Sequence, residues 1–288
     1  MKKFINKAAL LAALALGAQE STAQFYAGAT FGYGFATTTD VLGIDQTTNS
    51  SGQITQKNVY GTYGGGVTGQ INLGYYFNPH LRLDLGAYYL AGSTYTAAST
   101  ETPTSTFSRE VKTAQYRLQP TIVVQTGHGK LQPYARFGIV APLGGQTTRT
   151  EATTLPAINT TTTNVTVLKG SPSIGFVGGG GVAYELNDNM MITAEVLYTG
   201  VRIKTSSAML EKSETVTPTT TTDNLPNIST ISKEFNFVDE LTSSNNSLVT
   251  NPAPDVNKPQ DLLASKVNFS AVSIQLGFVY KFGATSEE

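Results

Sequence analysis

Seven charged residues of this sequence stand at alternate positions among apolar ones, where a β-strand would carry them on one face. They are Arg82, Asp84, Arg117, Arg136, Glu185, Glu195 and Lys281. Side chains two residues apart point to the same side of a strand, so Arg82 and Asp84 would lie together and opposite Leu83. If that side is an enclosed interior, each charge needs a partner, because an unpaired buried charge is strongly destabilising. The pattern therefore predicts an internal network of ion pairs.

Other residue types that often do chemistry are absent here or have a simpler interpretation. The sequence has no cysteine, which excludes disulfides and thiolate metal sites. Glycine runs at 64–66 and 178–181 are not phosphate loops, because such a loop must lead into a helix. These runs fall in or beside predicted strands, and we interpret them as bends or as room for a bulky neighbour. We expect no cofactor and no metal site.

The elements that would position the charges are eight amphipathic segments with period-2 alternation. They cover residues 24–35, 64–77, 81–95, 111–125, 131–142, 173–186, 190–203 and 272–282. Each is long enough to cross a membrane as a tilted strand of about 9–11 residues. After the first 23 residues there is no apolar run long enough for a helical span. A membrane-embedded chain would then have to be a closed barrel, since an open sheet leaves backbone groups unpaired in lipid.

The connections between these segments alternate strictly between long and short. The three short ones are turns, such as Asn78-Pro79-His80, and the long polar ones cover 36–63, 96–110, 144–170 and 205–266. Long connections at one end only are typical of outer-membrane barrels, whose longer loops are extracellular. This pattern predicts both termini in the periplasm. Ten strands are the alternative, because residues 228–238 could form one more hairpin.

The last segment, 272–282, ends in a pattern with a known counterpart. It reads polar, any residue, glycine, two of any kind, hydrophobic, any residue and aromatic, and so resembles the C-terminal β-signal of outer-membrane barrel proteins. The positions that carry this resemblance are Gln275, Gly277, Tyr280 and Phe282. In that family the barrel assembly machinery reads this strand, so the resemblance implies the same partner here. Six residues, 283–288, follow the final aromatic, where most family members stop.

As a whole, the chain resembles the small eight-stranded outer-membrane barrels, the group that includes the OmpA transmembrane domain and OmpX-like proteins. The resemblance implies an all-β fold, a transmembrane antiparallel up-and-down β-barrel over residues 24–288. It also implies a place in the cell outer membrane, in contact with outer-membrane lipid and lipopolysaccharide. Eight strands enclose an interior just wide enough for side chains to fill, so we expect a packed lumen.

The first 23 residues have the parts of a secretory signal peptide. Lys2 and Lys3 give a basic start, residues 8–18 form a short apolar run, and Ser21-Thr22-Ala23 supplies the small residues of a cleavage site. We expect export and cleavage after Ala23.

On this topology the charged residues fall at two levels of the barrel. Those expected nearer the periplasmic end are Arg82, Asp84, Glu185 and Lys281, with two charges of each sign. Arg117, Arg136 and Glu195 are expected near mid-height. Since this level has two arginines and one carboxylate, we expect Glu195 to bridge both arginines.

No motif in the sequence names a ligand. We favour a non-enzymatic membrane protein that acts through its extracellular loops, in surface interaction, adhesion or envelope integrity, with an unknown extracellular partner. The alternative is a transport protein or a narrow channel for a small solute. An enzyme is disfavoured, because barrel enzymes with a catalytic histidine place it near the extracellular rim, whereas His80 and His128 fall in predicted periplasmic turns. Without residues 1–23 the chain has 16 basic and 19 acidic residues, a net charge of −3, so we expect no nucleic-acid partner.

Overall fold

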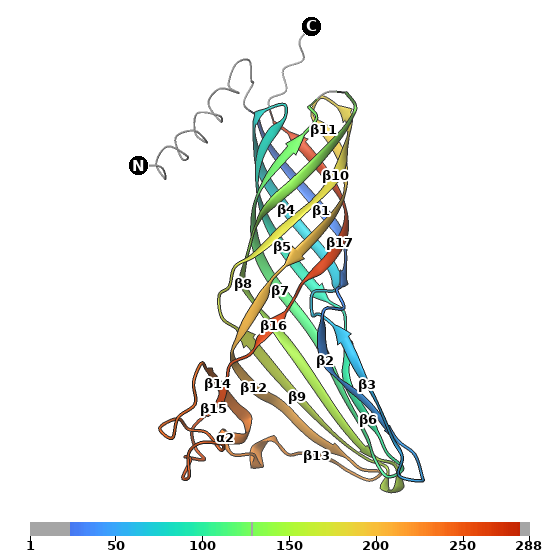
Figure 1. The fold of residues 1–288 in the computed structure, drawn as a ribbon, viewed down its shortest axis with the longest axis vertical. Coiled ribbons are helices and arrows are strands. Elements are labelled where there is room, and N and C mark those ends of the chain that lie inside the picture. Colours follow the sequence, from blue (N-terminus) through green and yellow to red (C-terminus); the bar gives the residue numbers. More distant parts are fainter. Residues whose placement is uncertain (1–23, 128, 283–288) are drawn as a thin grey trace.

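The computed structural model describes residues 24–127 and 129–282, and its centre is a closed antiparallel barrel of eight strands (Figure 1). The strands of the ring are β1 (Gln24–Ala36), β4 (Gly66–Asn78), β5 (Leu81–Gly92), β7 (Thr106–Gln125), β8 (Leu131–Leu155), β10 (Gly175–Asn187), β11 (Met190–Gly200) and β17 (Ala271–Lys281). Each pairs with the next, and β17 pairs with both β11 and β1, which closes the ring. The expected signal peptide, residue 128 and the tail 283–288 lie outside the described residues.

The alternation of the strands places apolar side chains on the outside of the barrel and polar ones inside, as expected. In β17, Ile274 and Leu276 are more than half exposed, whereas Ser273 and Gln275 are buried. In β7, Ile122 is exposed while Arg117 and its polar neighbours on the same face are buried. This arrangement inverts that of a water-soluble protein, and it suits a barrel whose outer surface meets lipid.

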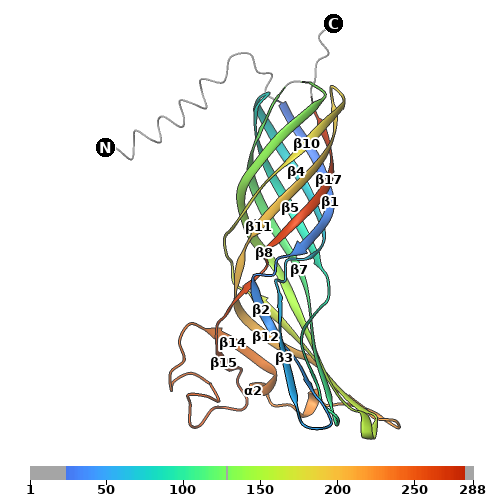
Figure 2. The ribbon, with the colours of Figure 1, turned by 45° about the vertical axis from the view of Figure 1, so that its right-hand side comes forward.

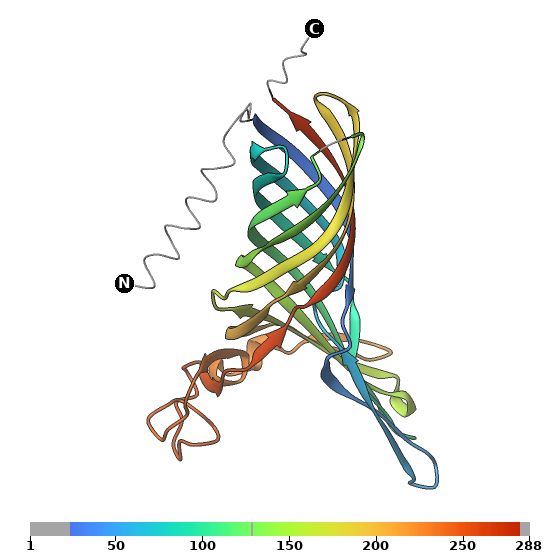
Figure 3. The same cartoon turned by 45° about the horizontal axis from the view of Figure 1, so that its top comes forward.

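The short and long connections lie at opposite ends of the barrel. The three short connections, which follow β4, β7 and β10, share the end where β1 starts and β17 stops, which we call the turn end. All four long segments extend from the other end, the loop end (Figures 1 and 2). Figure 3 shows the tilted strands of the barrel wall from nearer the turn end.

The four long segments contain more β-structure than the expected strand limits allowed. Strands β7 and β8 stay paired with each other beyond the barrel at the loop end. There β8 also pairs with β9 (Thr160–Gly170), β9 pairs with β12 (Arg202–Val216), and further strands follow. These are β2 (Asp40–Thr48), β3 (Ile54–Gly61), β6 (Tyr95–Glu101), β13 (Thr221–Asp223), β14 (Glu234–Val238), β15 (Gln260–Leu263) and β16 (Lys266–Asn268). Threonine is abundant in these strands, and its branched side chain favours extended backbone.

Residues 228–238 do not add a hairpin to the barrel, so the ten-strand alternative is wrong. They form the short helix α2 (Thr230–Lys233) and β14, which pairs with β12 and, in parallel, with β15. This segment stands apart from the β2–β3 hairpin at the loop end (Figures 1 and 2). The other helices in the part of the chain that the structure describes are single 3-10 turns, η1 (Pro156–Ile158) and η2 (Leu225–Asn227).

Within the described part of the chain, no helix has both the length and the apolar character needed to cross a membrane.

Candidate functional site

The lumen of the barrel contains a chain of four charged side chains, each at most 3% exposed: Arg82, Asp84, Arg136 and Glu195. Asp84 accepts a hydrogen bond from Arg136 at 2.8 Å and lies 3.5 Å from the Nε of Arg82. The other side of the Arg136 guanidinium donates to Glu195 at 3.3 Å. The Tyr26 hydroxyl also donates to Asp84, and the Tyr134 hydroxyl donates to Glu195 at 2.9 Å.

Arg82 lies among three tyrosine rings on the turn-end side of this chain. Its guanidinium carbon is 5.3 to 5.5 Å from the ring centroids of Tyr26, Tyr76 and Tyr134. Its Nη1 donates to the Tyr76 hydroxyl at 2.9 Å and to Gln125 at 3.1 Å. The π-faces of aromatic rings attract cations, so this cage offsets part of the cost of removing the guanidinium from water.

Arg117 is not bridged by Glu195, and that expectation is wrong. In the described residues no carboxylate lies within ion-pair distance of Arg117. Its Nε donates instead to Gln115 at 2.9 Å, and its guanidinium lies 5.4 Å from the ring centroid of Tyr88. Asp84, which we expect nearer the periplasmic end, pairs instead with Arg136 from the mid-height group. Asp84 therefore connects the two levels of charged residues. Barrel strands are tilted by about 35–45°, so residues at similar places along different strands differ in height.

The remaining predicted lumen charges form a separate pair nearer the turn end. Lys281 Nζ lies 2.7 Å from Glu185 Oε1, and both side chains are partly exposed, at 14% and 28%. The lysine also lies 5.8 Å from the ring centroid of Tyr76. All seven charged residues singled out in the sequence therefore face the interior or its turn-end mouth.

The four residues that resemble an assembly signal lie on both faces of β17. Gln275 is buried and donates to Ser273 at 3.2 Å, while Tyr280 and Phe282 are exposed with ring centroids 5.2 Å apart. Gly277 is tightly enclosed, since a Cβ there would come within 2.5 Å of the Thr193 hydroxyl oxygen. The use of this strand by the assembly machinery remains a prediction.

His80 and the glycines of β10 have structural surroundings among the described residues. His80 lies in the turn between β4 and β5, with its Nδ1 3.2 Å from the carbonyl oxygen of Gln125, and His128 is outside the described residues. The glycines of β10 make room for neighbours, because a Cβ at Gly181 would come within 2.7 Å of the Tyr134 ring. No group of three potential metal ligands occurs among the described residues.

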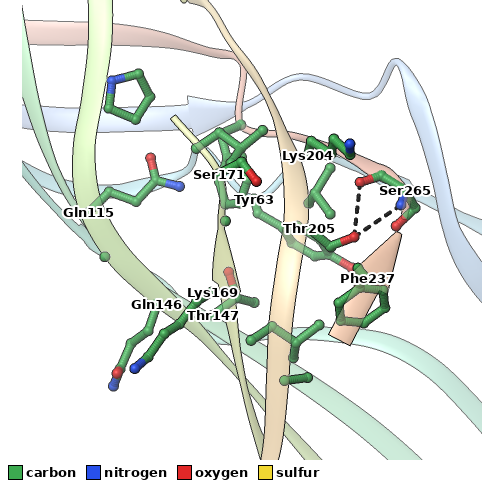
Figure 4. Close-up of a pocket in the computed structure, with 18 of the residues that line it drawn as sticks. Tyr63, Gln115, Gln146, Thr147, Lys169, Ser171, Lys204, Thr205, Phe237 and Ser265 are labelled. Atoms are coloured by element: carbon green, nitrogen blue, oxygen red, sulfur yellow. Dashed lines mark hydrogen bonds between the residues drawn. The ribbon is translucent and has the colours of Figure 1, made fainter. Parts of the chain in front are cut away.

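Sequence reasoning missed a pocket of about 360 Å³ at the loop end. Its lining includes Gln115 of β7 and Phe237 of β14, which lie on opposite sides of the pocket in Figure 4. Its apolar side chains include Ile203, Phe235, Phe237, Leu262, Val267 and Phe269. The only signal in the sequence was the presence of phenylalanine and leucine in segments otherwise rich in threonine, serine and asparagine.

The pocket lies where the barrel wall changes partners. Strand β8 pairs with β10 as far as Val140 and with β9 from Thr147 onward. Residues 142–146, together with Ser171 and Pro172 of the β9–β10 connection, line the pocket. On the opposite side, the Thr205 hydroxyl donates to the carbonyl oxygen of Ser265 at 3.2 Å, which holds β12 to the β15–β16 connection (Figure 4).

Basic side chains surround this apolar interior. The lining includes Arg109, Arg149, Lys169 and Lys204, and no aspartate or glutamate. Just outside the lining, Glu151 lies 2.7 Å from Arg109 Nε and 3.8 Å from Arg149 Nε, and Asp239 pairs with Lys204 at 2.6 Å.

Tyr63 adds a neutral polar group to the same pocket. Burial raises the pKa of its hydroxyl, although the positive charges of Arg109 and Arg149 oppose that rise. The hydroxyl therefore stays protonated at neutral pH and can donate a hydrogen bond.

The profile of the family described as "Outer membrane protein beta-barrel domain" matches residues 7–229, well over half of the chain. No curated protein matches the sequence. Among solved structures, Neisserial surface protein A (NspA) aligns with 12% identity and a TM-score of 0.42, over 91% of this chain and 100% of that one. The outer membrane protein OprG from Pseudomonas aeruginosa aligns with 13% identity and a TM-score of 0.42, over 93% and 99%. A major outer membrane protein from Thermus thermophilus aligns with 12% identity and a TM-score of 0.38, over 91% and 100%.

Proposed function

Because the chain belongs to the outer membrane protein β-barrel domain family, we propose that it is a non-enzymatic protein that acts at the cell surface through its loop end. In this proposal the signal peptide 1–23 exports the chain, the assembly machinery inserts it, and the loop end faces outward. Its partners are outer-membrane lipid, lipopolysaccharide and an extracellular molecule that contacts the extended strands.

The observation that carries this proposal is the filled lumen. Arg82, Asp84, Arg136 and Glu195 connect β5, β8 and β11 across the interior through ion pairs. The rings of Tyr26, Tyr76 and Tyr134 occupy space on the turn-end side. An interior held this way supports a structural role for the barrel and leaves recognition to the loop end.

The size of the loop end supports the same proposal. Strand β8 has 25 residues, whereas a tilted membrane strand needs about 9–11. The extra length of β7 and β8, with β9 and β12, forms an extended sheet beyond the barrel (Figure 1). A rigid β-surface of this kind can present contact residues at low entropic cost, because its backbone is already ordered.

Conductance across planar bilayers tests the proposal. We expect the intact protein to give no steady current, because the lumen charges and tyrosines block the path. The double variant Asp84→Ala/Arg136→Ala removes the centre of the network and should introduce current. Steady conductance of the unaltered protein would contradict the proposal and favour the alternative, a narrow channel for a small solute.

A further inference from the structure

We propose that the pocket at the loop end binds a small anionic amphiphile, a molecule with one apolar chain and a carboxylate head. This inference goes beyond the proposed function. Binding in the pocket does not depend on whether the lumen conducts, so the two can fail separately.

The interior of the pocket suits an apolar chain. Three segments that are far apart in the sequence meet there. They contribute Ile203 of β12, Phe237 of β14 and Phe269, which follows β16, to the lining. The volume of about 360 Å³ lies in the range of about 300–1,000 Å³ that is usual for small-molecule sites. Burying apolar ligand surface against these side chains would supply most of the affinity.

The charge of the lining selects an anionic head. Four basic side chains line the pocket, and the two neighbouring carboxylates, Glu151 and Asp239, compensate only two of those charges. Attraction between opposite charges is stronger in a partly enclosed site than in bulk water. A cationic or neutral head would gain nothing from this excess of positive charge.

One group of the lining has unused capacity for an anion. The Nε of Arg149 is buried without a hydrogen-bond partner, because Glu151 at 3.8 Å is too far away to accept one. A carboxylate in the pocket would give this Nε the partner that buried polar donors normally have. Lys169 is exposed and lies on the opposite face of the β8–β9 sheet, because Arg149 pairs with Thr166, three residues before Lys169.

The position of the pocket gives an amphiphile two sources. Leu143 lines the pocket and is also 70% exposed, so the pocket adjoins the exposed surface of β8. The ligand can therefore come from the outer leaflet or from the external solution. The chemistry of recognition is the same for both.

Tryptophan fluorescence can test binding, because the chain has no tryptophan of its own. Phe237→Trp places a single reporter in the pocket. Phe25→Trp is the matched control, since Phe25 is 66% exposed on the barrel wall at the turn end and would report only amphiphile dissolved in the bilayer. Both variants are reconstituted into phosphatidylcholine vesicles and titrated with a brominated twelve-carbon carboxylate, which quenches tryptophan on contact.

We expect saturable quenching of the Phe237→Trp variant at a concentration about tenfold below that needed for the Phe25→Trp variant. A brominated alkyl trimethylammonium of the same chain length should quench both variants alike. Equal quenching of both variants by the carboxylate, or equal quenching of the Phe237→Trp variant by the two head groups, would overturn the proposal.

Charge-removing variants in the Phe237→Trp background test the role of the basic groups. Arg149→Gln should weaken carboxylate binding by about tenfold, the effect of losing a charge-assisted hydrogen bond. Lys169→Gln and Lys212→Gln are the controls, because both remove the same charge, Lys169 on the opposite face of the β8–β9 sheet and Lys212 at an exposed position of β12 outside the pocket. Unchanged binding in Arg149→Gln, or an equal loss in Lys169→Gln, would refute the assigned head-group site.

Repeating the titration at a tenfold higher lipid concentration separates the two sources. An affinity that depends on the mole fraction of acid in the lipid identifies the outer leaflet as the source. An affinity that depends on the aqueous concentration identifies the external solution. Each result supports the site, whereas quenching without saturation at both lipid concentrations contradicts it.

Discussion

Of the two carboxylates in the buried network, Asp84 contacts more groups than Glu195. It contacts Arg82, Arg136 and the hydroxyl of Tyr26, whereas Glu195 contacts only Arg136 and Tyr134. Removing one partner of a buried ion pair leaves the other charge without compensation, which costs about 3–5 kcal/mol. Removing Asp84 leaves more groups without a partner than removing Glu195, so we expect it to lower the stability more.

Asp84→Ala should lower the free energy of unfolding by about 3–5 kcal/mol. Glu195→Ala should lower the free energy of unfolding by a smaller amount, because Arg136 keeps its contact with Asp84. Urea unfolding in lipid vesicles would measure both, with Asp188→Ala in an exposed turn as the control, expected to change stability by less than about 0.5 kcal/mol. An equal or larger loss for Glu195→Ala would contradict this ranking.

The two mid-barrel arginines should also respond differently to substitution. Arg136→Met leaves Asp84 and Glu195 without their shared partner, whereas Arg117→Met leaves only the amide oxygen of Gln115. We expect the Arg136 variant to be less stable than the Arg117 variant by about 2 kcal/mol or more, since an unpaired carboxylate costs more than an unpaired amide. The same unfolding assay compares them, and similar losses would mean that Arg117 has a charged partner after all.

Among the elements, β17 has the most demanding role because it completes the ring. It pairs along its length with β1 on one side and β11 on the other. At its end, the Phe282 amide donates to the carbonyl oxygen of Phe25 at 2.8 Å, so the last residue described is still part of the ladder. A defect in this strand would leave two edges open, which the interior of a membrane does not tolerate.

Phe282→Ala and Tyr280→Ala should lower the amount of protein inserted in the outer membrane and increase its degradation in the periplasm. Phe25→Ala is a matched control, because it removes an exposed aromatic from the neighbouring strand at the same end. On gels of unheated samples, the unfolded chain migrates more slowly than the folded barrel. The relative intensity of the two bands therefore measures the inserted fraction.

Deleting residues 283–288 should change insertion little, since the resemblance to the assembly signal ends at Phe282. Complete loss of insertion on that deletion, or an equal defect in Phe25→Ala, would show that the signal is assigned to the wrong residues.

At the scale of the whole molecule, the barrel is polarised along its axis. Turns of a few residues occupy one end, and an extended β-structure with a basic, apolar pocket occupies the other. Family membership places this barrel in an outer membrane, and the usual orientation puts the long loops outside.

Single cysteines can establish this orientation, because the chain has none of its own. Leu248→Cys, at an exposed position between β14 and β15, should react with a membrane-impermeant maleimide on intact cells. Asp188→Cys, in the turn between β10 and β11, should react only after the outer membrane is permeabilised. Labelling of position 188 in intact cells would contradict this orientation and place the turn end outside.

The sequence alone determined which residues form the barrel strands and which side of the wall each side chain faces. Both follow from a local rule, since successive side chains of a strand point to opposite faces and lipid requires the outer face to be apolar. Arg82 and Arg136 could therefore be assigned to the interior from the alternation of the sequence alone. Long polar segments at one end only also made the barrel topology predictable.

Only the tertiary structure decided which interior residues meet. Asp84 rather than Glu195 bridges two arginines, and Arg117 pairs with an amide, because strand tilt sets the relative heights of residues on different strands. The pocket depends on the same long-range geometry, since β8, β12, β14 and the β16–β17 region are far apart in the sequence and meet only in the tertiary structure. Period-2 alternation specifies the face of each residue but not its neighbour across the lumen, and that neighbour sets the pairing of charges.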